Sequence, residues 1–327
     1  MVKIFFRTDL NCKIGYGHFY RCFSIAEIVE NNYQVNFVFN KNITNSELIN
    51  SIPYPIVFIN EEKDFFTHLQ PGNIIVIDSY DFNEQLQNQL NELFIKLVVI
   101  DDLNNMNYDC NAVINHGVLF SEKEYKHSEK TKFYLGLDYL MVRKEFRDIS
   151  IVKSQRKPLN KIDNVFICFG GSNQEALIKK TVDILSNLEV KKISILASNL
   201  DLNELLLNNS EILQVEIYEN LKPNDIINIL QNSDFAILPA STILLEAFTV
   251  GIPIISGWFE ENQKYSLEKF EKMGLIINLD NFKSENYDSN LINAIKLLKN
   301  NFSIVKNQKK HINLQKRNFI KIFDELT

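Results

Sequence analysis

Short, continuous apolar runs recur along the chain and constrain its fold more than any other feature. They occupy residues 73–77 and 97–100 in the first half and residues 164–169 and 235–239 in the second. Runs without polar alternation are typical of strands inside a parallel sheet that is covered on both faces. Helical patterns fall between them, as at residues 82–94, so the alternation predicts an α/β fold.

A polar, basic stretch at residues 150–161 interrupts this pattern, which then restarts. We interpret it as a linker and predict two α/β domains in tandem, at residues 1–150 and 151–327. A chain of 327 residues, 45% of them hydrophobic, is long enough to form two cores. Because ligands of such sheets bind at the carboxyl ends of the strands, we expect the two domains to face each other across a ligand-binding cleft.

Charge and composition exclude several classes of function. Residues 1–150 hold 14 Lys and Arg against 20 Asp and Glu, which accounts for the whole net charge of −6. This acidity argues against nucleic acid as a partner and against stable association with an anionic membrane. No apolar run reaches membrane-spanning length, Arg7 and Asp9 interrupt the first one, and the four cysteines form no C-x-x-C pair. We therefore expect a cytoplasmic monomer that acts on a small molecule.

One glycine turn places a histidine where an anion would bind. The stretch Gly15-Tyr16-Gly17-His18 joins an apolar strand at residues 3–7 to a helical pattern at residues 23–29. The glycines let the backbone turn tightly, and a helix N-terminus presents free N–H groups to an anion. A neutral imidazole there can take up a proton near pH 7. The alternative is a glycine turn with a surface histidine.

A second glycine turn, Gly170-Gly171-Ser172-Asn173, has the pattern of a phosphate cradle between a strand and a helix. It is neither a Walker motif nor a dinucleotide fingerprint, because no Gly-Lys-Ser/Thr follows and G-x-G-x-x-G is absent. Ser241, Thr242 and Glu246 begin the helix after another strand. Hydroxyls there can bind phosphate, and a carboxylate can accept hydrogen bonds from ribose. For both stretches the alternative is a helix cap.

Polar residues also follow other strands. Asp78, Asp101 and Asp102 lie at expected strand ends, where carboxylates are either functional or caps. No third ligand stands at useful spacing from Asp101-Asp102, so we predict neither a metal site nor a cofactor. The amides of Asn262-Gln263 can bind hydroxyl or acetamido groups of a sugar, or cap a helix. The histidines expected on the surface or in packing are His68, His116, His127 and His311.

These motifs, taken in order, resemble one family over almost the full length of the chain. The residues that carry the resemblance are Arg7-x-Asp9, Gly15-Tyr16-Gly17-His18 with Arg21-Cys22, Asp78-x-Tyr80, Asp101-Asp102-Leu103, Leu135-Gly136, Arg143-x-Glu145-Phe146, Gly170-Gly171-Ser172, Glu246 before Gly251-Ile252-Pro253, and Asn262-Gln263. The chain resembles the UDP-sugar hydrolases of pseudaminic acid biosynthesis, which are related to the N-acetylglucosaminyltransferase of peptidoglycan synthesis. That resemblance implies the GT-B fold, with two Rossmann-like domains facing across a cleft.

The resemblance also implies roles for particular residues. It makes His18 the general base that activates water, brings Tyr80 and Asn262 to the sugar, and places UDP near Gly171, Ser172, Ser241 and Glu246. Ser79 stands where the family usually has a histidine between Asp78 and Tyr80. The residues that we add to the predicted substrate site are Gly15, Gly17, Arg21, Asp78 and Gln263. The residues that we add to the predicted nucleotide site are Gly170 and Thr242.

The reaction that the resemblance implies is hydrolysis of a UDP-linked diacetamido-trideoxy sugar to UDP and free sugar. Direct attack of water would invert the anomeric configuration, and the reaction would need no metal or cofactor. One alternative is a GT-B glycosyltransferase in which His18 deprotonates an acceptor hydroxyl instead of water. Another is a nucleotide-sugar binder without catalytic activity, although binding alone does not require His18.

Overall fold

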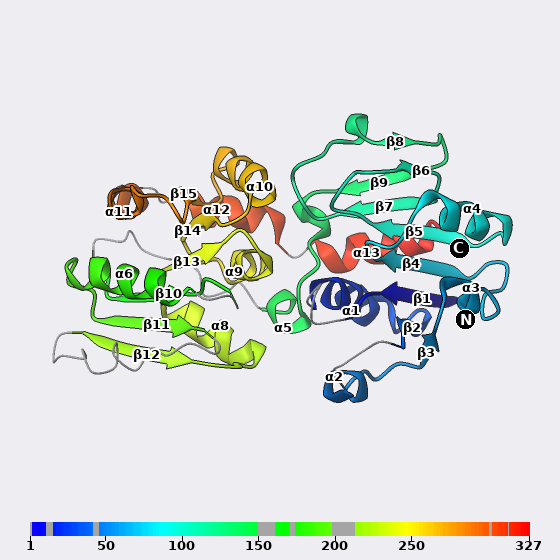
Figure 1. The fold of residues 1–327 in the computed structure, drawn as a ribbon, viewed down its shortest axis with the longest axis horizontal. Coiled ribbons are helices and arrows are strands. Elements are labelled where there is room, and N and C mark those ends of the chain that lie inside the picture. The colour runs from blue at the N-terminus through cyan, green and yellow to red at the C-terminus, as the bar shows by residue number, and fades with distance from the viewer. Residues whose placement is uncertain are drawn as a thin grey trace. The chain divides into compact units, whose positions relative to one another are not determined.

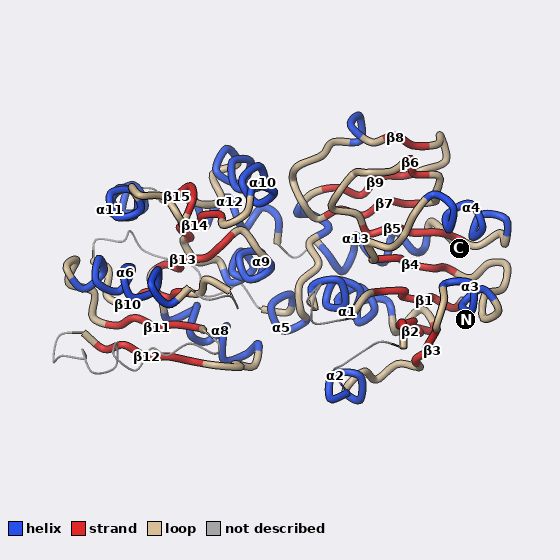
Figure 2. Tube along the Cα trace, viewed as in Figure 1, coloured by secondary structure: helices blue, strands red, loops and turns tan. Residues whose placement is uncertain are grey.

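The computed structural model describes residues 2–10, 16–41, 46–149, 161–170, 174–197, 213–300, 303–312 and 314–327, without the side chains of residues 46, 47, 262 and 300. The chain divides into two compact units, Met1–Lys144 with Asn313–Thr327, and Glu145–Ile312. Each unit is built on one large parallel sheet with helices packed against it (Figures 1 and 2). No helix in the described ranges is both long and apolar enough to cross a membrane.

The first unit contains a seven-stranded sheet. Its strands are β1 (Lys3–Thr8), β2 (Gln34–Asn40), β3 (Ile56–Ile59), β4 (Ile74–Asp78), β5 (Lys96–Ile100), β7 (Ala112–Asn115) and β9 (Lys132–Leu135). They lie in the order β3-β2-β1-β4-β5-β7-β9, and every neighbouring pair is parallel. Two short strands, β6 (Asn107–Tyr108) and β8 (Lys126–His127), pair with each other.

Helices cover both faces of this sheet. They are α1 (Gly17–Val29), α2 (Ser46–Asn50), α3 (Glu62–Phe66), α4 (Glu84–Glu92), α13 (Gln315–Asp324) and the 3₁₀ turns η1 (Glu122–Glu124) and η2 (Leu137–Tyr139). Side chains of β4 alternate between two cores: Ile74 and Val76 pack in one, Ile75 and Ile77 in the other. This alternation explains the continuous apolar run, because a strand that is buried on both faces needs apolar residues at every position.

The second unit contains a six-stranded parallel sheet. Its strands are β10 (Asn164–Ile167), β11 (Lys192–Leu196), β12 (Gln214–Tyr218), β13 (Phe235–Pro239), β14 (Ile254–Trp258) and β15 (Ile277–Asn281), in the order β12-β11-β10-β13-β14-β15. Its helices are α5 (Lys144–Arg147, at the boundary), α6 (Glu175–Ser186), α8 (Pro223–Asn232), α9 (Thr242–Val250), α10 (Glu261–Lys272), α11 (Tyr287–Asn300), α12 (Ser303–Gln308) and the turn η4 (Lys309–His311). The predicted α/β class, with parallel sheets in both halves, is confirmed.

The end of the chain differs from the sequence-based division, which carried the second domain to residue 327. In the structure α13 groups with the first unit. Phe319 and Phe323 are buried in the same core as α1 and β1, and Tyr33 donates a hydrogen bond to Asp324 at 2.8 Å. The apolar face of α13 thus completes the cover over the first sheet, a long-range contact that local patterns do not reveal.

Candidate active site

The carboxyl edge of the first sheet gathers the charged residues that the sequence placed at strand ends. Thr8 of β1 pairs with Asp78 of β4, and α1 begins beside them with Gly17 and His18. Asp101 and Asp102 follow β5, the next strand in the sheet. Because parallel strands end on the same side, side chains distant in sequence meet there.

His18 is held by a carboxylate. Its Nδ1 lies 2.5 Å from Oδ1 of Asp78, and both side chains are buried. Arg21 donates to both oxygens of the same carboxylate, with Nε at 2.8 Å from Oδ2 and Nη2 at 2.7 Å from Oδ1. Nη2 of Arg21 also lies 3.1 Å from His18 Nδ1, but its contact with Asp78 Oδ1 is the shorter one. Because a carboxylate only accepts hydrogen bonds, the 2.5 Å contact with Asp78 assigns the proton of His18 to Nδ1. Nε2 then carries a lone pair and can act as a base.

Arg21 links this pair to a second carboxylate. Its Nη1 donates to Oδ2 of Asp102 at 2.9 Å. Burial disfavours the guanidinium charge, but the carboxylates of Asp78 and Asp102 outweigh burial and raise the pKa of Arg21. Arg21 is therefore a permanent cation that keeps Asp78 available to His18.

Tyr80 packs against the imidazole of His18. The two rings meet edge to face with centroids 4.5 Å apart, and the Tyr80 hydroxyl is 3.4 Å from Asp102 Oδ2. Partial burial, followed by the charge of Asp102, raises the pKa of the phenol, so Tyr80 stays protonated near neutral pH. About half of its surface is exposed (51%), which leaves it accessible to a ligand.

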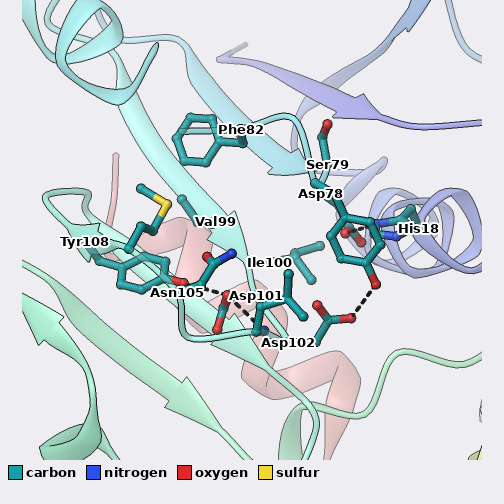
Figure 3. Close-up of a pocket in the computed structure, with 13 residues that line it drawn as sticks. His18, Asp78, Ser79, Phe82, Val99, Ile100, Asp101, Asp102, Asn105 and Tyr108 are labelled. Atoms are coloured by element: carbon teal, nitrogen blue, oxygen red, sulfur yellow. Dashed lines mark hydrogen bonds and ion pairs between the residues drawn. The ribbon is translucent and has the colours of Figure 1, made fainter. Parts of the chain in front are cut away.

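A pocket opens beside His18 (Figure 3). Its walls come from the start of α1, the segment after β4 and the loop after β5. Asp101 organises this loop: it accepts hydrogen bonds from Tyr108 at 2.6 Å, Tyr125 at 2.9 Å and the backbone amide of Asn104 at 3.1 Å. Of the two adjacent carboxylates, only Asp102 joins the network of His18. We call His18, Arg21, Asp78 and Asp102 the charged edge.

The sequence missed one partly buried residue next to the charged edge. β5 and β7 pair with Ile100 opposite Ile114, so His116 follows β7 at the level of Asp102. The backbone amide of Met141 donates to its Nδ1 at 3.3 Å. Burial and the nearby charge of Arg21 lower the pKa of His116 to about 3, so its ring is neutral. One feature of the sequence could have identified His116: it follows an apolar run, as Asp78 and Asp102 do.

The predicted turn around His18 is described in part. Gly15 lies outside the described residues, and Gly17 is the first residue of α1. A Cβ placed on Gly17 would meet no atom within 4 Å, so Gly17 leaves open space next to His18. Within the described ranges, no three His, Cys, Asp or Glu side chains are arranged to hold a metal.

The carboxyl edge of the second sheet carries the predicted nucleotide residues. β10 and β13 are neighbours, so Gly170 after the first and Ser241 after the second lie at adjacent strand ends. Gly170 has φ +87°, which favours glycine. Ser241 precedes α9 without capping it through its side chain, and Ser241 and Thr242 are both exposed. We call Gly170, Ser241, Thr242 and Glu246 the glycine edge; Gly171 and Ser172 lie outside the described residues.

Three predicted residues of this unit have mixed outcomes. Glu246 is buried at 2% exposure, and burial followed by the charge of Glu246 raises the pKa of the Cys168 thiol. Gln263 accepts from the backbone amides of Phe259 at 2.9 Å and Glu260 at 3.4 Å, which is the helix-cap alternative. Asn262 lies in the first turn of α10, and its contact with sugar stays a prediction.

Comparisons with known proteins agree with this architecture. No family model matches the chain. The chain is 23% identical over 286 residues to an uncharacterized protein of Methanocaldococcus jannaschii. The matched region covers 83% of this chain but only 58% of that protein. It is 22% identical over 284 residues to the UDP-2,4-diacetamido-2,4,6-trideoxy-β-L-altropyranose hydrolase of Campylobacter jejuni, covering 84% of this chain and 97% of the hydrolase.

Among solved structures, MurG of Acinetobacter baumannii superposes with a TM-score of 0.67 at 13% identity, over 98% of this chain and 99% of MurG. At that identity the likeness shows the fold alone. The expected resemblance is thus confirmed at two levels: the chain is similar in sequence to the Campylobacter hydrolase, and it has the GT-B fold of glycosyltransferases, with two Rossmann-like domains.

Proposed function

We propose that this protein is a nucleotide-sugar hydrolase that cleaves a UDP-linked diacetamido-trideoxy sugar in nonulosonic (pseudaminic) acid biosynthesis. The observation that carries the proposal is the contact of His18 Nδ1 with Asp78, which leaves Nε2 as a base at the pocket beside Tyr80. The similarity to the Campylobacter hydrolase along most of both chains supports the choice of substrate.

In the proposed reaction, Nε2 of His18 takes a proton from water while the water oxygen forms a bond to the anomeric carbon. The bond from that carbon to the UDP oxygen breaks, and UDP leaves with the bonding electron pair. A single displacement of this kind inverts the anomeric configuration. Asp78 stabilises the imidazolium that forms, and Arg21 fixes Asp78. A positioned general base contributes about 10²–10⁴-fold to the rate.

We further propose that the glycine edge binds UDP, together with Gly171 and Ser172. The exposed hydroxyls of Ser241 and Thr242 stand at the N-terminus of α9, which has nine residues. Free N–H groups and the helix dipole stabilise a diphosphate and the charge it gains on leaving. Tyr80 and Asn262 are assigned to the sugar, and Glu246 to the ribose.

A GT-B glycosyltransferase is the second candidate, because glycosyltransferases share this fold. His18 would then deprotonate an acceptor hydroxyl. The two reactions differ in whether UDP is released without an acceptor. The test is incubation of the protein with UDP-2,4-diacetamido-2,4,6-trideoxy-β-L-altropyranose alone, with UDP release and the free sugar followed by NMR.

We expect UDP and the sugar of inverted anomeric configuration in equal amounts. Release only after addition of an acceptor would overturn hydrolysis in favour of transfer. Tight UDP binding without release under either condition would indicate a binder. His68→Gln serves as the control variant, because His68 is exposed and outside the pocket.

A further inference from the structure

The pocket beside His18 has two unlike sides. His18 and Asp78 lie on one, whereas Phe82, Val99 and Tyr108 lie on the other, as Figure 3 shows. Met106 completes the apolar side and packs with Phe82 against the core that contains Val99 and Tyr108. The proposed reaction uses only the polar side, so the apolar side has no role in it.

Two of the three carboxylates around this pocket, Asp78 and Asp101, are engaged at both oxygens. Both oxygens of Asp78 are bonded to His18 or Arg21, and both oxygens of Asp101 accept from tyrosine hydroxyls and backbone amides. Asp102 Oδ2 receives Arg21 and Tyr80. A sugar hydroxyl that entered the apolar side would exchange water for carbon neighbours, which is unfavourable without a new hydrogen bond.

One amide lies beside the apolar side. Asn105 is exposed, lines the same pocket and belongs to the loop that Asp101 organises. Its side chain can donate to a carbonyl and accept from an N–H at the same time. An apolar wall next to a single amide complements a ligand group that carries a methyl or other alkyl end on an amide.

We infer that this pocket binds an N-acyl substituent of the sugar, with the acyl methyl against Phe82 and Met106 and the amide at Asn105. The inference rests on the proposed sugar-nucleotide substrate and adds the residues that select its substituent. A C-methyl group of the sugar would also fit the apolar wall, but it has no polar atom that could hydrogen-bond to Asn105. The acyl chain length that fits is set by the Met106 side chain.

The test compares UDP-sugars that carry N-acetyl groups with analogues that carry N-propionyl at one of the two amino positions. A pocket of fixed size discriminates one methylene by about 10–200-fold in kcat/KM. We expect a loss in this range at one position. Met106→Ala should reduce the ratio of acetyl to propionyl activity at that position at least about tenfold, because it frees the volume that the extra methylene needs.

Two variants guard against loss of folding and unspecific effects. Phe82→Leu, a milder change in the same wall, should shift the ratio in the same direction. Met273→Ala should leave the ratio unchanged, because Met273 lies in the second unit and outside the pocket. Equal use of acetyl and propionyl substrates at both positions, or a ratio that Met106→Ala does not move, would overturn the inference. Sensitivity confined to analogues lengthened at the C-methyl group would overturn it as well.

Binding separates this inference from the proposed reaction. The Kd of each analogue, measured by calorimetry with the wild type and Met106→Ala, reports the same ratio even if no UDP is released. Selective binding without release contradicts hydrolysis and supports the acyl pocket. Release without acyl selectivity supports hydrolysis and contradicts the pocket. Absence of binding for every analogue contradicts both.

Discussion

The two units place different chemistry at the same edge of the same kind of sheet. At the charged edge, four side chains bind one another in a chain of hydrogen bonds that is complete without a ligand. At the glycine edge, a glycine with positive φ and the exposed start of α9 offer backbone and hydroxyl groups. One edge therefore has a fixed proton acceptor, whereas the other has donors suited to an anion.

This difference indicates that the two units, although built on the same kind of sheet, are suited to different steps: one to proton transfer and the other to anion binding. An ordered base requires buried charges, and buried charges require partners within the protein. An anion site requires the opposite, because its donors must remain open to the ligand. Substitutions at the charged edge should therefore change catalysis and stability, and substitutions at the glycine edge should change affinity.

The largest expected effect separates catalysis from binding. His18→Gln removes the base, so kcat should fall by about 10²–10⁴-fold. The Kd for UDP should stay within about twofold, because UDP is assigned to the glycine edge. Initial rates of UDP release and calorimetry with UDP check the two values. A large loss of UDP affinity in this variant would show that His18 contacts the nucleotide, and the proposed division would be wrong.

Arg21→Met tests whether the charged edge is also a structural unit. The variant leaves Asp78 buried without its cation, and removal of one partner from a buried ion pair costs about 3–5 kcal/mol. Urea denaturation followed by fluorescence measures the loss in the free energy of unfolding. Arg317→Met is the matched control, because Arg317 is exposed on α13. Equal stability of the two variants would contradict the network.

How much of this comparison the sequence predicts depends on the range of the contacts involved. Asp78 and His18 were identified because each follows or precedes an apolar run, a local signal. The contact of Arg21 with Asp102 spans 81 positions and arises only when β4 and β5 lie side by side beneath α1. The same limit explains α13, whose buried face matches a core formed far away in the sequence.

Local alternatives also could not be resolved from residue type. Gln263 and Asp101 are residue types that often bind ligands. In the structure, Gln263 caps a helix and Asp101 holds a loop in place. Polar side chains satisfy nearby backbone amides as readily as they bind ligands. Only the hydrogen-bond partners distinguish these uses, and those partners are set by the fold.

At the glycine edge the expected effects are smaller. Ser241→Ala removes one hydroxyl from the start of α9, and one hydrogen bond contributes about 0.5–1.5 kcal/mol. The Kd for UDP should therefore rise about two- to tenfold with kcat unchanged. Ser289→Ala is the control, since Ser289 is exposed on α11, a helix that carries none of the proposed nucleotide residues. A fall in kcat at saturating substrate would mean that Ser241 acts in the reaction step.

The smallest effect concerns the pH dependence of stability caused by His116, next to the charged edge. The pKa of His116 is lowered from 6.5 to about 3 in the folded protein, by burial first and then by Arg21. The unfolded chain therefore binds a proton first as the pH falls below 6.5, and the folded state loses stability until the pH nears 3. Between pH 7.5 and 5.5 this histidine should remove about 1 kcal/mol from the free energy of unfolding. Over that pH range, the free energy of unfolding of His116→Gln should therefore fall by about 1 kcal/mol less than that of the wild type. Urea denaturation at both pH values measures the two losses. Parallel losses in the two proteins would show that His116 is not held neutral in the folded protein.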